Sequence, residues 1–71
     1  MLWSKKKNYP SRLSSRVARL SETELVRWTE TTFSDLGRQL RDASNADSLS
    51  DAVGTSEALH LLVAERKRRL L

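Results

Sequence analysis

The chain contains no cysteine, one proline, two glycines and one histidine among its 71 residues. Without cysteine it forms neither a disulfide nor a thiolate zinc site, which are two devices that stabilise many small domains. One histidine, His60, cannot assemble a metal site alone, and two glycines are too few for a phosphate-binding loop. Serines such as Ser14 and Ser21 have no histidine-containing motif to activate them. The sequence therefore predicts a protein that is not an enzyme and has no cofactor, metal or small-molecule substrate.

Long hydrophobic runs are also missing. The apolar stretch Met1-Leu2-Trp3 gives way at once to charged residues, so neither a signal peptide nor a membrane span is expected. The lack of cysteine fits a reducing compartment, and we expect a soluble, cytoplasmic protein. A chain of this length buries only about 60% of the surface that its unfolded form exposes. We therefore expect it to associate with a second copy of itself or with another protein.

Positive charge is concentrated at the N-terminus. Residues 1–20 contain six basic and no acidic side chains, whereas residues 21–71 contain seven basic and nine acidic ones. The six candidate anion contacts are Lys5, Lys6, Lys7, Arg12, Arg16 and Arg19. They would suit a nucleic-acid backbone, an anionic membrane surface with Met1-Leu2-Trp3 as an apolar anchor, or an acidic protein surface. Charged termini also simply keep small proteins in solution, and the sequence does not choose among these interpretations.

A long amphipathic helix is expected at residues 22–43. The run Ser21-Glu22-Thr23-Glu24 has the pattern of a capping box, in which Ser21 and Glu24 each bond the backbone N–H of the other. The apolar positions after it recur at helical spacing and share one side. These positions are Leu25, Val26, Trp28, Phe33, Leu36, Leu40 and Ala43.

A turn at residues 44–47 and a second helix at residues 48–70 are expected to follow, with Asp47 or Ser48 as the N-cap. Periodicity predicts that this helix runs through Gly54, which would point away from the apolar side. The predicted apolar side contains Leu49, Ala52, Val53, Leu59, Val63 and Leu70. The cluster Arg66-Lys67-Arg68-Arg69 suits the negative end of the helix dipole.

A short basic helix is expected at residues 11–20, because Leu13, Val17 and Leu20 recur at helical spacing beside the three arginines. A helix this short is marginal alone in water, so we expect it to form only when its apolar stripe packs. Residues 1–10 show no pattern, and we expect a mobile basic leader there.

Together these patterns predict an all-α protein, in which a long antiparallel helical hairpin at residues 21–71 follows the leader and the short helix. The predicted function is that of a small interaction or adaptor subunit, with the basic arm as a tether; nucleic-acid backbone binding and membrane-surface association are the alternatives. Leu61 lies off the predicted apolar side and, with Leu62, suggests a further contact. Trp28 suits either a half-buried core position or an aromatic anchor. We expect Trp28, Leu61 and Leu62 to contact the partner.

Overall fold

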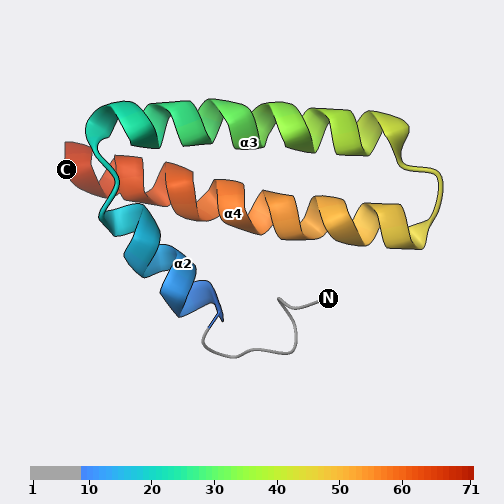
Figure 1. The fold of residues 1–71 in the computed structure, drawn as a ribbon, viewed down its shortest axis with the longest axis horizontal. Helices are drawn as coiled ribbons and strands as arrows, with labels where there is room; N and C mark the ends of the chain where they lie inside the picture. The colour runs from blue at the N-terminus through green and yellow to red at the C-terminus, as the bar shows by residue number, and fades with distance from the viewer. Residues whose placement is uncertain (1–8) are drawn as a thin grey trace.

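The structure, a computed structural model, describes the backbone of residues 9–71 and the side chains of residues 12–71. This part of the chain forms three helices and no strand (Figure 1). They are α2 at Tyr9–Ala18, α3 at Glu22–Asp42 and α4 at Ala46–Leu70. The prediction of an all-α fold is confirmed. The expected leader falls mainly on residues 1–8, which lie outside the described residues.

Helix α3 begins at the capping box that the sequence predicts. The backbone N–H of Glu24 donates to Ser21 Oγ at 3.1 Å, and the backbone N–H of Ser21 donates to Glu24 Oε1 at 2.9 Å. These two bonds satisfy N–H groups that have no partner inside the helix, and they lower the pKa of Glu24. Local chemistry therefore fixes the start of α3 regardless of how the helix packs.

Helix α4 begins two residues earlier than expected, because Asn45 is its N-cap and not Asp47 or Ser48. Asn45 Oδ1 accepts a hydrogen bond from the backbone N–H of Ser48 at 2.9 Å. Asparagine is as good an N-cap as aspartate or serine, and Asp47 then adds a favourable negative charge to the first turn. The connection between α3 and α4 is consequently short, at residues 43–45.

Helix α2 also begins earlier than expected, at Tyr9 and not at residue 11. Proline is tolerated in the first turn of a helix, where its missing N–H would have no intrahelical partner, so Pro10 is compatible with this start. At the other end, the N–H groups of Arg19 and Leu20 donate three residues back along the chain, at 3.1 Å each. This tighter turn closes α2 before the capping box of α3.

Helices α3 and α4 lie side by side, and the chain reverses its direction between them (Figure 1). Arg69, near the end of α4, accordingly lies 3.7 Å from Glu22 at the start of α3. The seam between the helices follows a spacing of three and four residues, which is typical of helices that pack along their length. It combines leucines with small side chains. Its buried and half-buried members include Leu25, Thr29, Thr32 and Leu36 on α3, and Ala52, Thr55, Ala58, Leu59 and Leu62 on α4.

The core lies at one end of the helix pair, where α2 packs against α4 (Figure 1). Val17, Leu25 and Leu62, one from each helix, are buried against one another. Leu13 and Leu20 are half-buried around them. The apolar stripe of α2 is therefore packed as predicted, and the core joins all three helices.

The predicted apolar side of α4 is wrong in most of its residues. Four of its members, Leu49, Val53, Val63 and Leu70, are exposed, whereas Gly54 is buried. The side of α4 that is buried is instead the one that carries Leu62 and Glu65. Hydrophobic periodicity favours the row that contains Leu49, Val53 and Val63, but α4 packs through the neighbouring row, in which small residues such as Thr55 alternate with leucines such as Leu62. Among residues 9–71, no helix has both the length and the apolar composition needed to cross a membrane.

Replacing Leu62 tests this placement. We expect Leu62→Ala to lower the free energy of unfolding by about 2 to 4 kcal/mol, since it leaves a cavity beside Leu25. Urea denaturation followed by circular dichroism at 222 nm measures the change. The matched control is Leu70→Ala, because Leu70 is 76% exposed and Leu62 only 2%; it should change stability by less than about 0.5 kcal/mol. Equal losses for the two variants would contradict the placement.

Candidate interaction surfaces

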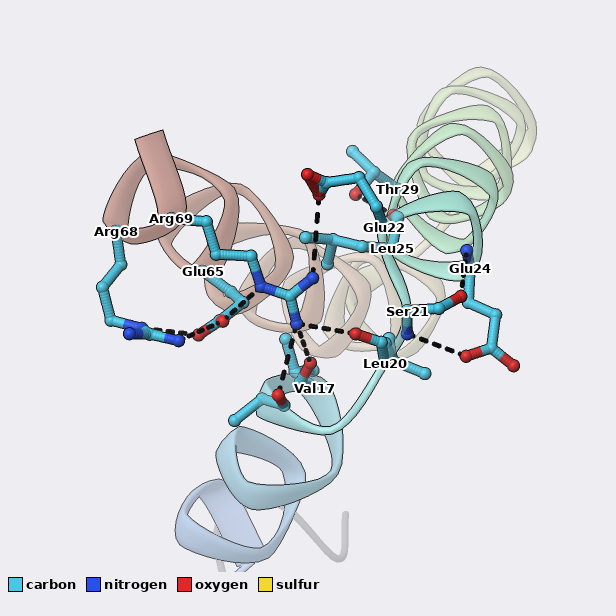
Figure 2. A network of polar contacts seen from close by, with 11 residues as sticks. Val17, Leu20, Ser21, Glu22, Glu24, Leu25, Thr29, Glu65, Arg68 and Arg69 are labelled. Atoms are coloured by element: carbon cyan, nitrogen blue, oxygen red, sulfur yellow. Dashed lines mark hydrogen bonds and ion pairs between the residues drawn. The ribbon is translucent and has the colours of Figure 1, made fainter. Parts of the chain in front are cut away.

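Arg69 joins α4 to the end of α2 (Figure 2). Its Nη2 donates to the backbone carbonyl oxygen of Leu20 at 2.7 Å, of Ala18 at 3.2 Å and of Val17 at 3.5 Å. Carbonyl groups at the end of a helix lack intrahelical partners and carry partial negative charge. The guanidinium group therefore caps α2 from a residue about fifty positions further along the chain.

Glu65 holds this arginine in place. Glu65 is only 9% exposed. Its carboxylate accepts two hydrogen bonds from Arg68, at 3.1 and 2.6 Å, and one from Arg69 Nε at 2.7 Å. The bonds from Arg68 and then from Arg69 lower the pKa of Glu65 to about 2. Arg69 therefore bridges a carboxylate of its own helix and the carbonyl groups of another (Figure 2).

Only part of this network is predictable from the sequence. Glu65 is three residues before Arg68 and four before Arg69, which are the spacings of side-chain pairs on one face of a helix. The sequence pattern indicates the arginines only as favourable charges near the end of the helix. The bonds from Arg69 to Val17, Ala18 and Leu20 depend on tertiary packing, and no local pattern indicates them.

Trp28 lies at the junction of α3 with α2. It is 45% exposed and, with five residues of or just after α2, lines a shallow pocket of about 240 Å³. The other lining residues are Leu13, Arg16, Val17, Arg19 and Leu20. One part of the indole is thus covered within the chain and another is accessible. This placement is compatible both with a half-buried core position and with an aromatic anchor for a partner.

The other predicted partner contacts are placed differently. Leu62 is in the core, so its side chain packs within the chain and is not presented to a partner. Leu61 is half-buried. Periodicity predicts the seam of α4 on the neighbouring row of residues, so these two leucines fall outside the predicted apolar side.

The three predicted arginines of the basic arm are exposed. Arg12 and Arg16 lie on α2 and Arg19 just after it, beside the apolar stripe, and Arg16 and Arg19 line the pocket at Trp28 together with Val17. Arg66 and Lys67 are also exposed, near the end of α4. The other predicted anion contacts, Lys5, Lys6 and Lys7, and the apolar residues Met1-Leu2-Trp3 lie outside the described residues.

A third surface is apolar and extends along both long helices. We call it the open apolar face. Its members are exposed, apart from half-buried Val26. They are Val26, Phe33 and Leu40 on α3, and Leu49, Val53 and Val63 on α4. Sequence reasoning assigns these side chains to the apolar sides of the two helices, but it does not separate them from the seam between the helices.

All six residues fall on one side of the helix pair. Helical projection at about 100° per residue, viewed along α3 from Glu22, places the α3 members clockwise from the seam. The α4 members lie anticlockwise from the seam in the same view, because α4 runs back toward Glu22. Trp28 projects to the other side, where α2 packs, and Figure 2 shows α2 on that side of the two helices. The open apolar face is therefore opposite α2.

The remaining polar groups form surface pairs. Arg38 lies 2.8 Å from Asp35, and Arg41 lies 3.2 Å from Asp42, all with exposed or half-buried side chains. Such pairs contribute at most a few tenths of a kcal/mol each to stability. Within residues 9–71, no three histidine or carboxylate side chains gather where they could hold a metal ion.

Comparison with protein-family models, with curated proteins and with solved structures finds no significant match to this chain. The interpretation of its surfaces consequently depends on their geometry and chemistry.

The network at Glu65 generates a prediction for acid pH. Because the folded-state pKa of Glu65 is about 2, below the ordinary value of 4.5, its stabilisation is complete above about pH 4.5 and is lost as the pH falls toward 2. We expect Glu65→Gln to be less stable than the unchanged protein at pH 6, and this difference to shrink between pH 4.5 and 2. Thermal unfolding at several pH values, at fixed protein concentration, measures it.

The control for this experiment is Glu57→Gln, since Glu57 is exposed on the same helix. Its unfolding curve should follow that of the unchanged protein over the same pH range. A difference between Glu65→Gln and the unchanged protein that stays constant from pH 6 to 2 would show that the carboxylate of Glu65 is not held by its arginines.

Proposed function

We propose that this protein is a non-enzymatic interaction subunit, in which α3 and α4 act as an antiparallel helical hairpin that binds another protein through the open apolar face. In this proposal α2 stiffens one end of the hairpin and carries arginines that orient the complex on an anionic surface. The observation that supports the proposal is the position of the apolar side chains. They are outside, on one side, and aligned along both helices.

A surface of this kind is unfavourable in an isolated chain. Phe33 alone is 68% exposed, and its neighbours on the face add branched side chains along about 21 Å of each helix. Contiguous apolar patches on soluble proteins usually mark a site of interaction, because covering them removes apolar area from water. The patch is long and narrow, which suits a helical partner that lies along the hairpin.

Site-specific photo-crosslinking tests the proposal. With p-benzoylphenylalanine in place of Phe33, irradiation of the cells that make the protein should yield a covalent adduct with a protein. The matched control places the same residue at Thr31, which is exposed on α3 and projects away from the open apolar face. Equal yields at the two positions, or none at position 33, would contradict a role for this face.

A second function is favoured by the exposed arginines of the α2 region. Arg12, Arg16 and Arg19 project to one side, and basic side chains at this density suit the phosphate groups of a nucleic acid. This alternative uses the basic arm in place of the open apolar face. The two functions therefore depend on different residues and can be separated.

Fluorescence anisotropy of a labelled mixed-sequence duplex tests this alternative at several salt concentrations. If the three arginines bind phosphates, replacing all three with alanine should reduce the slope of log affinity against log salt by about 2.7, or about 0.9 for each arginine that no longer meets a phosphate. The control replaces Arg27, Arg38 and Arg41, three exposed arginines of α3, and should leave the slope unchanged. Absence of binding at low salt would exclude the alternative.

A further inference from the structure

Helix α4 carries a second row of residues at heptad spacing, besides the row that packs against α3. Its steps alternate between four and three residues, as in helices that pack along their length against a neighbour. The row consists of Leu49, Val53, Ser56, His60, Val63, Lys67 and Leu70. Every member is exposed, including Leu70 at 76%. A helix with two such rows has the pattern of a corner of a bundle, where it contacts one neighbour on each row.

The α3 part of the open apolar face has an internal symmetry. Val26 and Leu40 are each seven residues from Phe33, so a two-fold axis that crosses α3 at Phe33 sets Val26 of one copy against Leu40 of the other. Phe33 then meets Phe33. A two-fold interface uses the same patch on both copies, and it requires this kind of self-complementarity.

Two of the three members of the α4 part of the face, Leu49 and Val63, have the same symmetry about Ser56. Leu49 and Val63 are each seven residues from Ser56, so the same operation sets Leu49 of one copy against Val63 of the other. Ser56 of one copy then meets Ser56 of the other. On α4 the axis therefore passes between two small side chains, and on α3 it passes between two large ones. The two-fold axis therefore pairs the outermost apolar residues of both stripes, and Val53 is the one member without a symmetric counterpart on the face.

The two centres of symmetry lie at the same level along the helix pair. Leu25 packs against Leu62, and Glu22 lies 3.7 Å from Arg69. Counting along both helices from these pairs brings Phe33 level with Ser56, to within about one turn. A single two-fold axis, lying in the plane of the face and crossing both helices, therefore satisfies α3 and α4 together.

On this basis we propose that the occupant of the open apolar face is a second copy of this chain, and that the two hairpins stack face to face as a four-helix bundle. This inference rests on the proposed function and names its partner. Each α3 lies antiparallel to the α3 of the other copy, and each α4 to the other α4. The α2 helices remain on the outer sides of the bundle.

Charge and size agree with this arrangement. Glu22 lies beside the stripe at one end of α3, and Arg41 lies beside it at the other end, so the two-fold axis brings Glu22 of one copy toward Arg41 of its partner. The apolar members span about 21 Å of each helix, and the polar residues beyond them can extend the contact toward the full 38 Å length of the chain. A strip of that full length and the width of two helices, about 20 Å, is comparable with the roughly 800 Å² that each partner contributes to a stable interface.

Light scattering of the purified full chain tests the inference, with the mass measured over a range of concentrations. The 8.1 kDa chain should give twice that mass, and Phe33→Glu should give a single-chain mass with its helical content retained. Phe33 is exposed in one chain, so this substitution removes the interface without opening the core. Thr31→Glu, on the other side of α3, should stay dimeric.

The register is tested separately with single cysteines, because the natural sequence contains none. Ser56→Cys should form an intermolecular disulfide on mild oxidation, since the axis sets the two side chains against each other, and Thr31→Cys should not. A disulfide at position 31 in place of 56 would overturn the register.

Other masses separate this inference from the proposed function. A single-chain mass at every concentration, a mass above that of a dimer, or a dimer that Phe33→Glu leaves intact would overturn the second copy as occupant. A protein adduct at position 33 other than the chain itself, combined with a single-chain mass in solution, would preserve the proposed function and assign the face to a different protein.

Discussion

The fold depends on Arg69 and the carboxylate that holds it. Helix α2 has ten residues and few apolar side chains, and a helix of that length is marginal in water. It remains helical because Val17 packs into the core and because Arg69 donates to the three carbonyl oxygens around its end. Glu65 positions the guanidinium group, and burial of Glu65 is possible because two arginines satisfy its oxygens. Without this pair, the helix dipole of α2 and the carboxylate of α4 would both be uncompensated.

The composition of the seam also accounts for the apolar side chains left outside it. The seam combines leucines, among them Leu25 and Leu62 of the core, with small residues such as Ala52 and Thr55. Each long helix carries further apolar side chains, such as Phe33 and Leu49, on its outer row. The same packing that closes the chain around α2 therefore leaves an apolar stripe on the opposite side.

Local features are predictable from the sequence, and tertiary ones are not. The capping box at Ser21 and Glu24 is complete within four residues, so it is recognisable directly. Asn45 and Asp47 are similar capping residues two positions apart, and only the packed helix decides between them. The predicted apolar side of α4 includes Ala52, which is buried, but it is centred too far toward Leu49 and Val53, because both are more apolar than Thr55 on the row that packs. The sequence indicates that Leu62 makes a contact beyond the predicted apolar side of α4. In the structure this contact is with Val17 of α2 and Leu25 of α3 in the same chain, not with a partner.

The contact between Arg69 and the end of α2 also affects the order in which the helices become stable during synthesis. The residues of α2 leave the ribosome before those of α3 and α4, yet the guanidinium group that caps them is about fifty residues behind, and Leu62 of the core is about forty-five residues behind Val17. Until those residues emerge, α2 has neither its cap nor its packing partner and stays largely unfolded. Of the three described helices, α2 is therefore the first to be made and the last to become stable, and its arginines stay on a flexible, accessible segment until Leu62 and Arg69 emerge.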